Sequence, residues 1–217
     1  MYLEKMDIFF NNRVDEYDSH MLNDVIGCKE GYDKIANLVP RNAVKLLDLG
    51  CGTGLELQKI LKLNPNIEIT GIDLSQGMLN KLKQKYSKYN IKLICDNYLE
   101  CEFGKDIFDC VISFQTMHHF NHENKLKIYK KIHDALKSNG VYIEGDYVAK
   151  SQEEENFYFS EFEKIRKEQN INKNQLVHFD TPCTVENQIK LLKTAGFSKS
   201  EKVWQVESTA IIVNWKK

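Results

Sequence analysis

Residues 44 to 62 read VKLLDLGCGTGLELQKILK, an apolar run that meets three glycines and then continues with a helical pattern. The run VKLLDL (44–49) stops at Gly50, which predicts a short buried strand. After the glycines, Leu57, Ile60 and Leu61 fall on one stripe of a helix. A strand, a glycine turn and a helix in this order indicate an α/β sheet in which a ligand lies against the bare backbone of the turn.

The same alternation of strand and helix patterns continues along the chain. Further strands are predicted at 67–73, 91–96, 108–114 and 140–148, with helices at 75–86 and 122–137. Apolar strands separated by helices are typical of a parallel sheet covered on both faces. Residues 199–208 and 209–217 then predict a hairpin. We therefore expect an α/β fold with one doubly wound, mostly parallel, seven-stranded sheet that ends in an antiparallel C-terminal hairpin.

The length of 217 residues fits one domain. We expect a single domain over 1–217 with four parts: an N-terminal helical cap (1–40), a ligand-binding core (41–150), a lid or substrate insertion (151–180), and the last helix with the terminal strands (181–217). The cap and the insertion are the segments expected to fold over the carboxyl ends of the strands, where ligands of such sheets bind.

Charge and composition exclude several partners. The net charge is −1, and only three basic residues are arginine (Arg13, Arg41 and Arg166), so we expect no nucleic-acid partner. No apolar run approaches the length of a membrane span and no signal peptide is recognisable, which favours a cytoplasmic protein without a membrane partner. The six cysteines form no C-x-x-C pair and no cluster with histidine at zinc spacing, so no metal site is predicted. A monomer or a homodimer is expected.

The glycine spacing G-x-G-x-G distinguishes between ligands. A dinucleotide fingerprint needs a third glycine at position 55, which is Leu55, and no Gly-Lys-Ser/Thr follows for a phosphate loop. Asp73 ends the next strand beside the turn, where its carboxylate can accept hydrogen bonds from both hydroxyls of a ribose. Asp96, at the end of the third strand, is placed to reach the adenine of the same nucleoside. Asp48 is placed to hold the turn or to meet a cationic ligand.

Each of these features also has a purely structural interpretation. The glycine turn can be a tight strand-to-helix connection without a ligand, Asp73 can cap the helix that follows it, and Asp96 can cap a turn.

Taken in order, these segments resemble the class I S-adenosylmethionine-dependent methyltransferases. The segments that carry the resemblance are LLDLGCGTG, GIDLS, CDN, FDCVISFQTMHHF, LKSNGVYIEGDY and TVENQIKLLKTAGF, and they cover roughly residues 41 to 215. The resemblance implies a Rossmann-like methyltransferase fold, S-adenosylmethionine as cofactor, and S-adenosylhomocysteine as product.

The resemblance also implies roles for individual residues. The backbone of Gly50, Cys51 and Gly52 would meet the methionine part of the cofactor. Leu74 and Met78 would pack on the adenine, and Asp96 with Asn97 would address its amine and ring. Phe114 and Gln115 would line the sulfonium side. Tyr17 resembles a tyrosine that closes over the cofactor carboxylate. Together with Asp48 and Asp73, these residues are the predicted cofactor site.

Candidates for catalysis and substrate contact are fewer. His118, His119 and Tyr17 are possible proton-transfer groups, although histidines at this place in such proteins often only shape the pocket wall. His119, Asp146, Tyr147 and His178 are candidates for substrate contact.

We expect transfer of a methyl group from S-adenosylmethionine to an oxygen, nitrogen or sulfur atom of a small molecule. Two alternatives remain: a protein that binds this cofactor or its product without turnover, and a nicotinamide-dependent oxidoreductase, which Leu55 disfavours.

Overall fold

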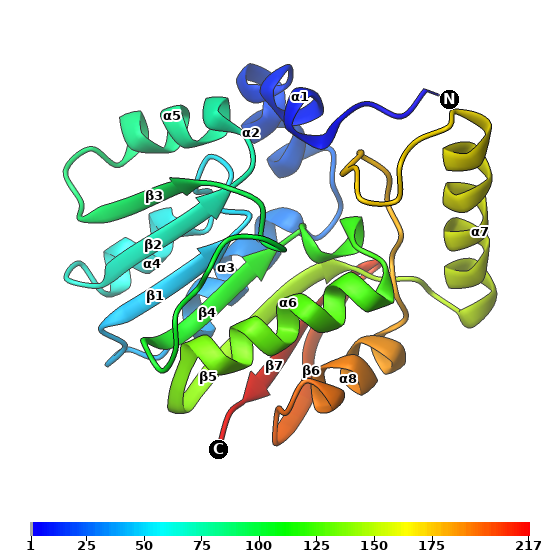
Figure 1. Cartoon of the computed structure of the whole chain (residues 1–217). Coiled ribbons are helices and arrows are strands. Elements are labelled where there is room, and N and C mark those ends of the chain that lie inside the picture. The colour runs from blue at the N-terminus through cyan, green and yellow to red at the C-terminus, as the bar shows by residue number, and fades with distance from the viewer. Residues whose placement is uncertain (1) are drawn as a thin grey trace.

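The computed structural model describes residues 2–217, which form one seven-stranded sheet with helices around it (Figure 1). The strands are β1 (Lys45–Leu49), β2 (Glu68–Asp73), β3 (Ile91–Cys95), β4 (Phe108–Phe114), β5 (Leu136–Tyr147), β6 (Lys199–Val206) and β7 (Thr209–Trp215). Their spatial order is β3-β2-β1-β4-β5-β7-β6. Strands β1 to β5 pair in parallel, whereas β7 runs antiparallel to both β5 and β6. The predicted fold class is confirmed.

The helices begin and end close to the predicted positions. They are α1 (Met6–Asn11), α2 (Val14–Asn23), α3 (Cys28–Leu38), α4 (Leu57–Leu63), α5 (Gln76–Lys85), α6 (His122–Ala135), α7 (Gln152–Glu168) and α8 (Val185–Thr194), with a 3₁₀ turn η1 (Met117–His119). Ser75 caps α5 by accepting a hydrogen bond of 3.2 Å from the backbone N–H of Met78. Helix α6 ends two residues earlier than predicted, because Leu136 already pairs with Phe108 as the start of β5.

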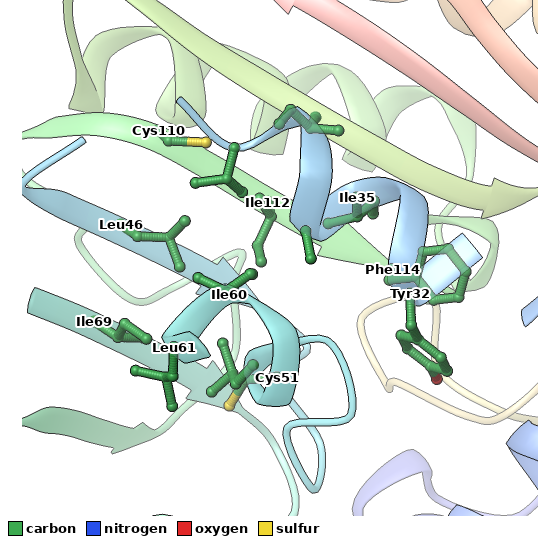
Figure 2. Close-up of a cluster of buried hydrophobic side chains, with 14 of the residues drawn as sticks. Tyr32, Ile35, Leu46, Cys51, Ile60, Leu61, Ile69, Cys110, Ile112 and Phe114 are labelled. Carbon is green, nitrogen blue, oxygen red and sulfur yellow. The ribbon is translucent and has the colours of Figure 1, made fainter. Parts of the chain in front are cut away.

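Two hydrophobic cores lie on opposite faces of the sheet. Neighbouring strand residues point to opposite faces, so Leu46 belongs to one core and Leu47 to the other. Figure 2 shows part of the first core, in which Ile35 of α3 and Ile60 of α4 contact the sheet. On the other face, α6 packs through its buried residues Ile128, Tyr129 and Ile132. Because helices cover both faces of the sheet, the strands carry apolar side chains on both sides.

Two parts of the chain lie outside this three-layer core. Helices α1 and α2 sit at the carboxyl ends of β1, β2 and β3 (Figure 1). Asn11 of α1 holds this position, because its Oδ1 accepts hydrogen bonds of 2.9 Å from the backbone N–H of Gly77 and from the hydroxyl of Ser75. Helix α7 stands at the other side of the molecule, beyond β5.

Among the helices of residues 2–217, none has the length and apolar character needed to cross a bilayer.

Candidate active site

The glycine turn between β1 and α4 has a backbone that only glycine adopts easily. Gly50, Gly52 and Gly54 have φ values of +71°, +46° and +75°. A Cβ atom on Gly50 would lie 2.7 Å from the hydroxyls of Thr116 and Tyr98. On Gly52 the nearest atom to such a Cβ would be Cε1 of Tyr17, 3.7 Å away. One face of Gly52 is therefore open, which is what a ligand lying against the main chain requires.

A pocket of about 530 Å³ opens in front of this turn. Its wall combines the turn, the ends of β2 to β4 and the N-terminal helices: Met6, Phe10, Tyr17, Gly50, Gly52, Asp73, Leu74, Met78, Asp96, Asn97, Tyr98, Gln115, Thr116, His119, Phe120 and Leu176. Nine of the predicted cofactor residues are in this wall: Tyr17, Gly50, Gly52, Asp73, Leu74, Met78, Asp96, Asn97 and Gln115.

Three predicted residues do not line the pocket. Asp48 is buried, and its pKa is raised by burial and by the neighbouring carboxyl of Glu56. Cys51 turns its sulfur toward the backbone of Gly71. The ring of Phe114 packs against Tyr32, with ring centroids 4.5 Å apart. The side chains of Cys51 and Phe114 belong to the hydrophobic core, so only the backbone of Cys51 is near the ligand side of the turn.

Asp73 holds the glycine turn and at the same time faces the pocket. Its Oδ2 accepts a hydrogen bond of 2.9 Å from the N–H of Gly52, and its Oδ1 accepts one of 2.8 Å from the N–H of Ser75. Burial raises the pKa of Asp73 to about 6, although these backbone N–H groups favour its charged form. The structural and the ligand-binding interpretations are compatible, because a carboxylate has about four acceptor positions and the backbone N–H groups around Asp73 do not use all of them.

The side chains of Asp96 and Asn97 also accept hydrogen bonds from backbone N–H groups of their own turn. Oδ1 of Asp96 accepts a hydrogen bond of 2.7 Å from the N–H of Asn97, and Oδ1 of Asn97 accepts one of 3.0 Å from the N–H of Leu99. Both residues line the pocket. Their contact with an adenine stays a prediction.

Helix α2 closes over the turn through two adjacent residues. The ring of Tyr17 faces Gly52, and burial raises the pKa of its hydroxyl, which therefore keeps its proton. Asp18 accepts hydrogen bonds from the hydroxyl of Thr53 and from Nζ of Lys85, the second at 2.9 Å. Sequence reasoning proposed Tyr17 and missed Asp18, whose partners lie 35 and 67 positions away in the sequence.

A second, larger cavity that is open to solvent adjoins the first, and its empty space of about 2210 Å³ includes part of that solvent. The two share Phe10, Tyr17, Gln115 and His119. Gln115 has φ +53°, a conformation that side chains rarely adopt and that often marks a functional position. The rest of the wall comes mainly from residues 9–26, with His118, Tyr147, Lys150, His178, Asp180 and residues 207–209. No residue of α7 is among them.

The candidate catalytic and substrate residues line this second cavity, except Asp146, which is buried behind His118 and does not reach the cavity wall. Nδ1 of His118 lies 2.7 Å from Oδ1 of the buried Asp146, and Nδ1 of His119 lies 3.3 Å from Oδ1 of Asp180. Burial opposes charge on His118, but Asp146 outweighs it and raises the pKa. Burial lowers the pKa of His119, and it lowers the pKa of His178 to about 4. The hydroxyl of Tyr147 donates to that of Tyr158.

Several pocket residues carry no recognisable signal in the sequence, namely Met6, Phe10, Tyr98, Thr116, Phe120 and Leu176.

Comparisons with known proteins agree with this geometry. The model of a methyltransferase domain family matches residues 46–140. The chain is 26% identical over 185 residues to carboxy-S-adenosyl-L-methionine synthase of Nautilia profundicola, covering 79% of this chain and 77% of that one. It is 30% identical over 128 residues to malonyl-[acyl-carrier protein] O-methyltransferase of Priestia megaterium, covering 58% of this chain and 46% of that one.

Among solved structures, a putative O-methyltransferase from Nostoc punctiforme superposes with a TM-score of 0.73 at 22% identity. The match covers 98% of this chain and 62% of that chain, so this protein spans less than two thirds of that relative. The fold, the ordered motifs and the pocket in front of the glycine turn coincide with one family. Over residues 46–140 the chain matches a methyltransferase domain family, and it is similar to the class I S-adenosylmethionine-dependent methyltransferases, whose cofactor is S-adenosylmethionine.

Proposed function

We propose that the protein transfers a methyl group from S-adenosylmethionine to a nucleophilic atom of a small molecule held in the larger cavity. The observation that carries this proposal is the wall shared by the two cavities, formed by Phe10, Tyr17, Gln115 and His119. A donor in one cavity and an acceptor in the other would meet at this wall. Holding two reactants in such an arrangement contributes up to roughly 7–11 kcal/mol in the best intramolecular cases.

The residues of the first pocket fit the cofactor. Asp73 retains acceptor positions for ribose hydroxyls, Leu74 and Met78 offer apolar contact for the adenine, and Gly52 offers open backbone. The cofactor supplies an electrophilic methyl group when it is bound. Tyr17, which stays protonated, can donate a hydrogen bond to an anionic group of the ligand.

The sequence relative that makes carboxy-S-adenosyl-L-methionine suggests a second candidate function. A product of that kind carries an additional carboxylate, which a buried site would normally pair with a cation. The wall of the cofactor pocket contains neither lysine nor arginine, whereas Arg13 and Lys150 lie in the larger cavity. A carboxylate that projects past the shared wall could pair with one of these two cations, so the second candidate stands beside methyl transfer and the reaction product distinguishes them.

The test incubates the protein with S-adenosylmethionine labelled in its methyl group and a broad mixture of small metabolites. Label recovered in a metabolite supports the proposal. A carboxylated cofactor detected by mass spectrometry would instead support the second candidate. No product from broad mixtures, together with tight calorimetric binding of S-adenosylhomocysteine, would indicate a protein that binds the cofactor without turnover.

A further inference from the structure

We propose that His118, His119 and Asp180 form a binding site for a divalent transition-metal ion such as Zn²⁺, with His178 at its edge. Three ligand atoms of this group, one from each of the first three residues, lie within 4.8 Å of one another. All four side chains line the larger cavity. The prediction of no metal site considered only local spacing of cysteine and histidine, and these residues come from segments 60 positions apart.

The distances match the ligand spacing of a small tetrahedral site. Oδ1 of Asp180 lies 3.3 Å from Nδ1 of His119, 3.5 Å from Nε2 of His118 and 3.8 Å from Nε2 of His178. Ligand atoms about 2.0–2.1 Å from a tetrahedral Zn²⁺ are about 3.3–3.4 Å apart. The distances from Asp180 to His118 and His119 are therefore compatible with shared coordination of one ion, and all three ligand atoms lie within 4.8 Å of one another.

The contacts among these groups are ion-pair contacts of imperfect hydrogen-bond geometry. Nδ1 of His119 and Oδ1 of Asp180 are buried and lie 3.3 Å apart, but their angle does not meet that of a regular hydrogen bond. The side chain of His119 is only 5% exposed. In the tautomer of His118 that carries its proton on Nδ1, this nitrogen donates a hydrogen bond to Asp146. The other ring nitrogen, Nε2, then presents a lone pair on the side of Asp180. A metal ion among these atoms satisfies all of them together.

The surroundings fix the proposed ligands in place. Asp146 orients the ring of His118 from behind, which is the arrangement that carboxylates adopt around metal-bound histidines. The N–H and the hydroxyl of Thr181 both donate to the carbonyl oxygen of His118, at 2.8 and 3.0 Å, and so hold the two ligand segments together. The ring of His178 stacks on Phe9 at a centroid distance of 3.5 Å.

The donor set indicates the kind of ion. Two imidazole nitrogens and one carboxylate suit Zn²⁺, Fe²⁺ or Co²⁺, whereas Mg²⁺ and Ca²⁺ prefer oxygen ligands. Three protein ligands at the edge of a cavity leave a coordination position open, as in catalytic rather than structural sites.

The test titrates the tag-free, chelator-treated full chain with Co²⁺ alone and follows visible absorption, then displaces the ion with Zn²⁺. We expect saturation at one ion per chain, and at least about tenfold weaker binding for Asp180→Asn and Asp146→Asn. Calorimetric binding of S-adenosylhomocysteine and thermal unfolding check that these variants fold. The matched control is His20→Gln, because His20 lies 3.1 Å from Asp24 but belongs to no three-ligand group in residues 2–217.

Three outcomes overturn the proposal: no saturable Co²⁺ spectrum, unchanged binding in Asp180→Asn, or binding that is lost only in His122→Gln. The last would place the ion at the other candidate group, His122, Glu155 and Cys183.

A consequence for the substrate rests on the proposed function. His119 also lines the cofactor pocket, so an acceptor with an oxygen that ligates the ion would lie next to the methyl donor. Removing the ion should then lower methyl transfer without changing the affinity for S-adenosylhomocysteine. If methyl transfer is absent both with and without the ion, the proposed function is contradicted. The metal site is then judged by the Co²⁺ titration alone.

Discussion

At the scale of single residues, Asp73 connects the glycine turn to the ligand. Asp73→Ala removes the proposed contacts to the ribose and the hydrogen bond to the N–H of Gly52. We expect the affinity for S-adenosylhomocysteine to fall by roughly 1–3 kcal/mol, the cost of leaving such groups unpaired. Isothermal calorimetry measures this change, with the exposed Asp33→Ala as control. Equal affinity in the wild type and Asp73→Ala would refute the ribose assignment.

The pKa of Asp73 also predicts how the affinity for S-adenosylhomocysteine varies with pH. Binding of ribose hydroxyls uses the charged form of Asp73, and burial raises its pKa to about 6 in the ligand-free protein. The affinity for S-adenosylhomocysteine should therefore be constant above this pKa and fall by up to about tenfold per pH unit below it. Calorimetry at pH 5, 6 and 7.5 tests this. In Asp73→Ala the inflection near pH 6 should vanish, and an inflection that persists there belongs to another group.

At the scale of elements, helix α2 is held at the site by Asp18. Asp18→Ala removes its bonds to Thr53 and Lys85, of which the one to Lys85 is partly exposed and contributes little. We expect about 0.5–1.5 kcal/mol weaker binding of S-adenosylhomocysteine, because Tyr17 then covers Gly52 for a smaller fraction of the time. Hydrogen exchange should become faster in α2 and unchanged in β1. Asp24→Ala at the end of the same helix should alter neither measurement.

The elements themselves were largely predictable, and their polar contacts were not. Strand β4 was expected at 108–114 and lies at Phe108–Phe114, because an apolar run between polar flanks leaves little choice of boundary. The contact of Asp18 with Thr53 joins two segments that no local pattern relates. Phe114 was assigned to the pocket, yet its ring faces the core. Strand β4 ends at Phe114, and the chain turns at Gln115 with φ +53°, which places Gln115 in the pocket wall.

At the scale of the whole molecule, a group of buried polar side chains lies where β5 meets α6 and α8. Glu144 accepts hydrogen bonds from the hydroxyl of Tyr129, at 2.8 Å, and from the amide of Gln188. Burial and the neighbouring Asp146 raise the pKa of Glu144 to about 7, while the buried Lys125 opposes this rise. The folded protein thus holds a proton on Glu144 at pH values where the unfolded chain has lost it.

This difference in proton binding predicts how stability varies with pH. The stabilising contribution of Glu144 is complete below pH 4.5 and is lost as the pH rises through about 7, because the folded state binds more protons over that range. Glu144→Gln keeps the acceptor oxygen for Tyr129 and cannot ionise. The free energy of unfolding of the variant, relative to that of the wild type, should therefore increase from pH 5 to pH 8. Urea denaturation at both pH values measures it, and a relative free energy that does not change would show that Glu144 is ionised in the folded protein throughout.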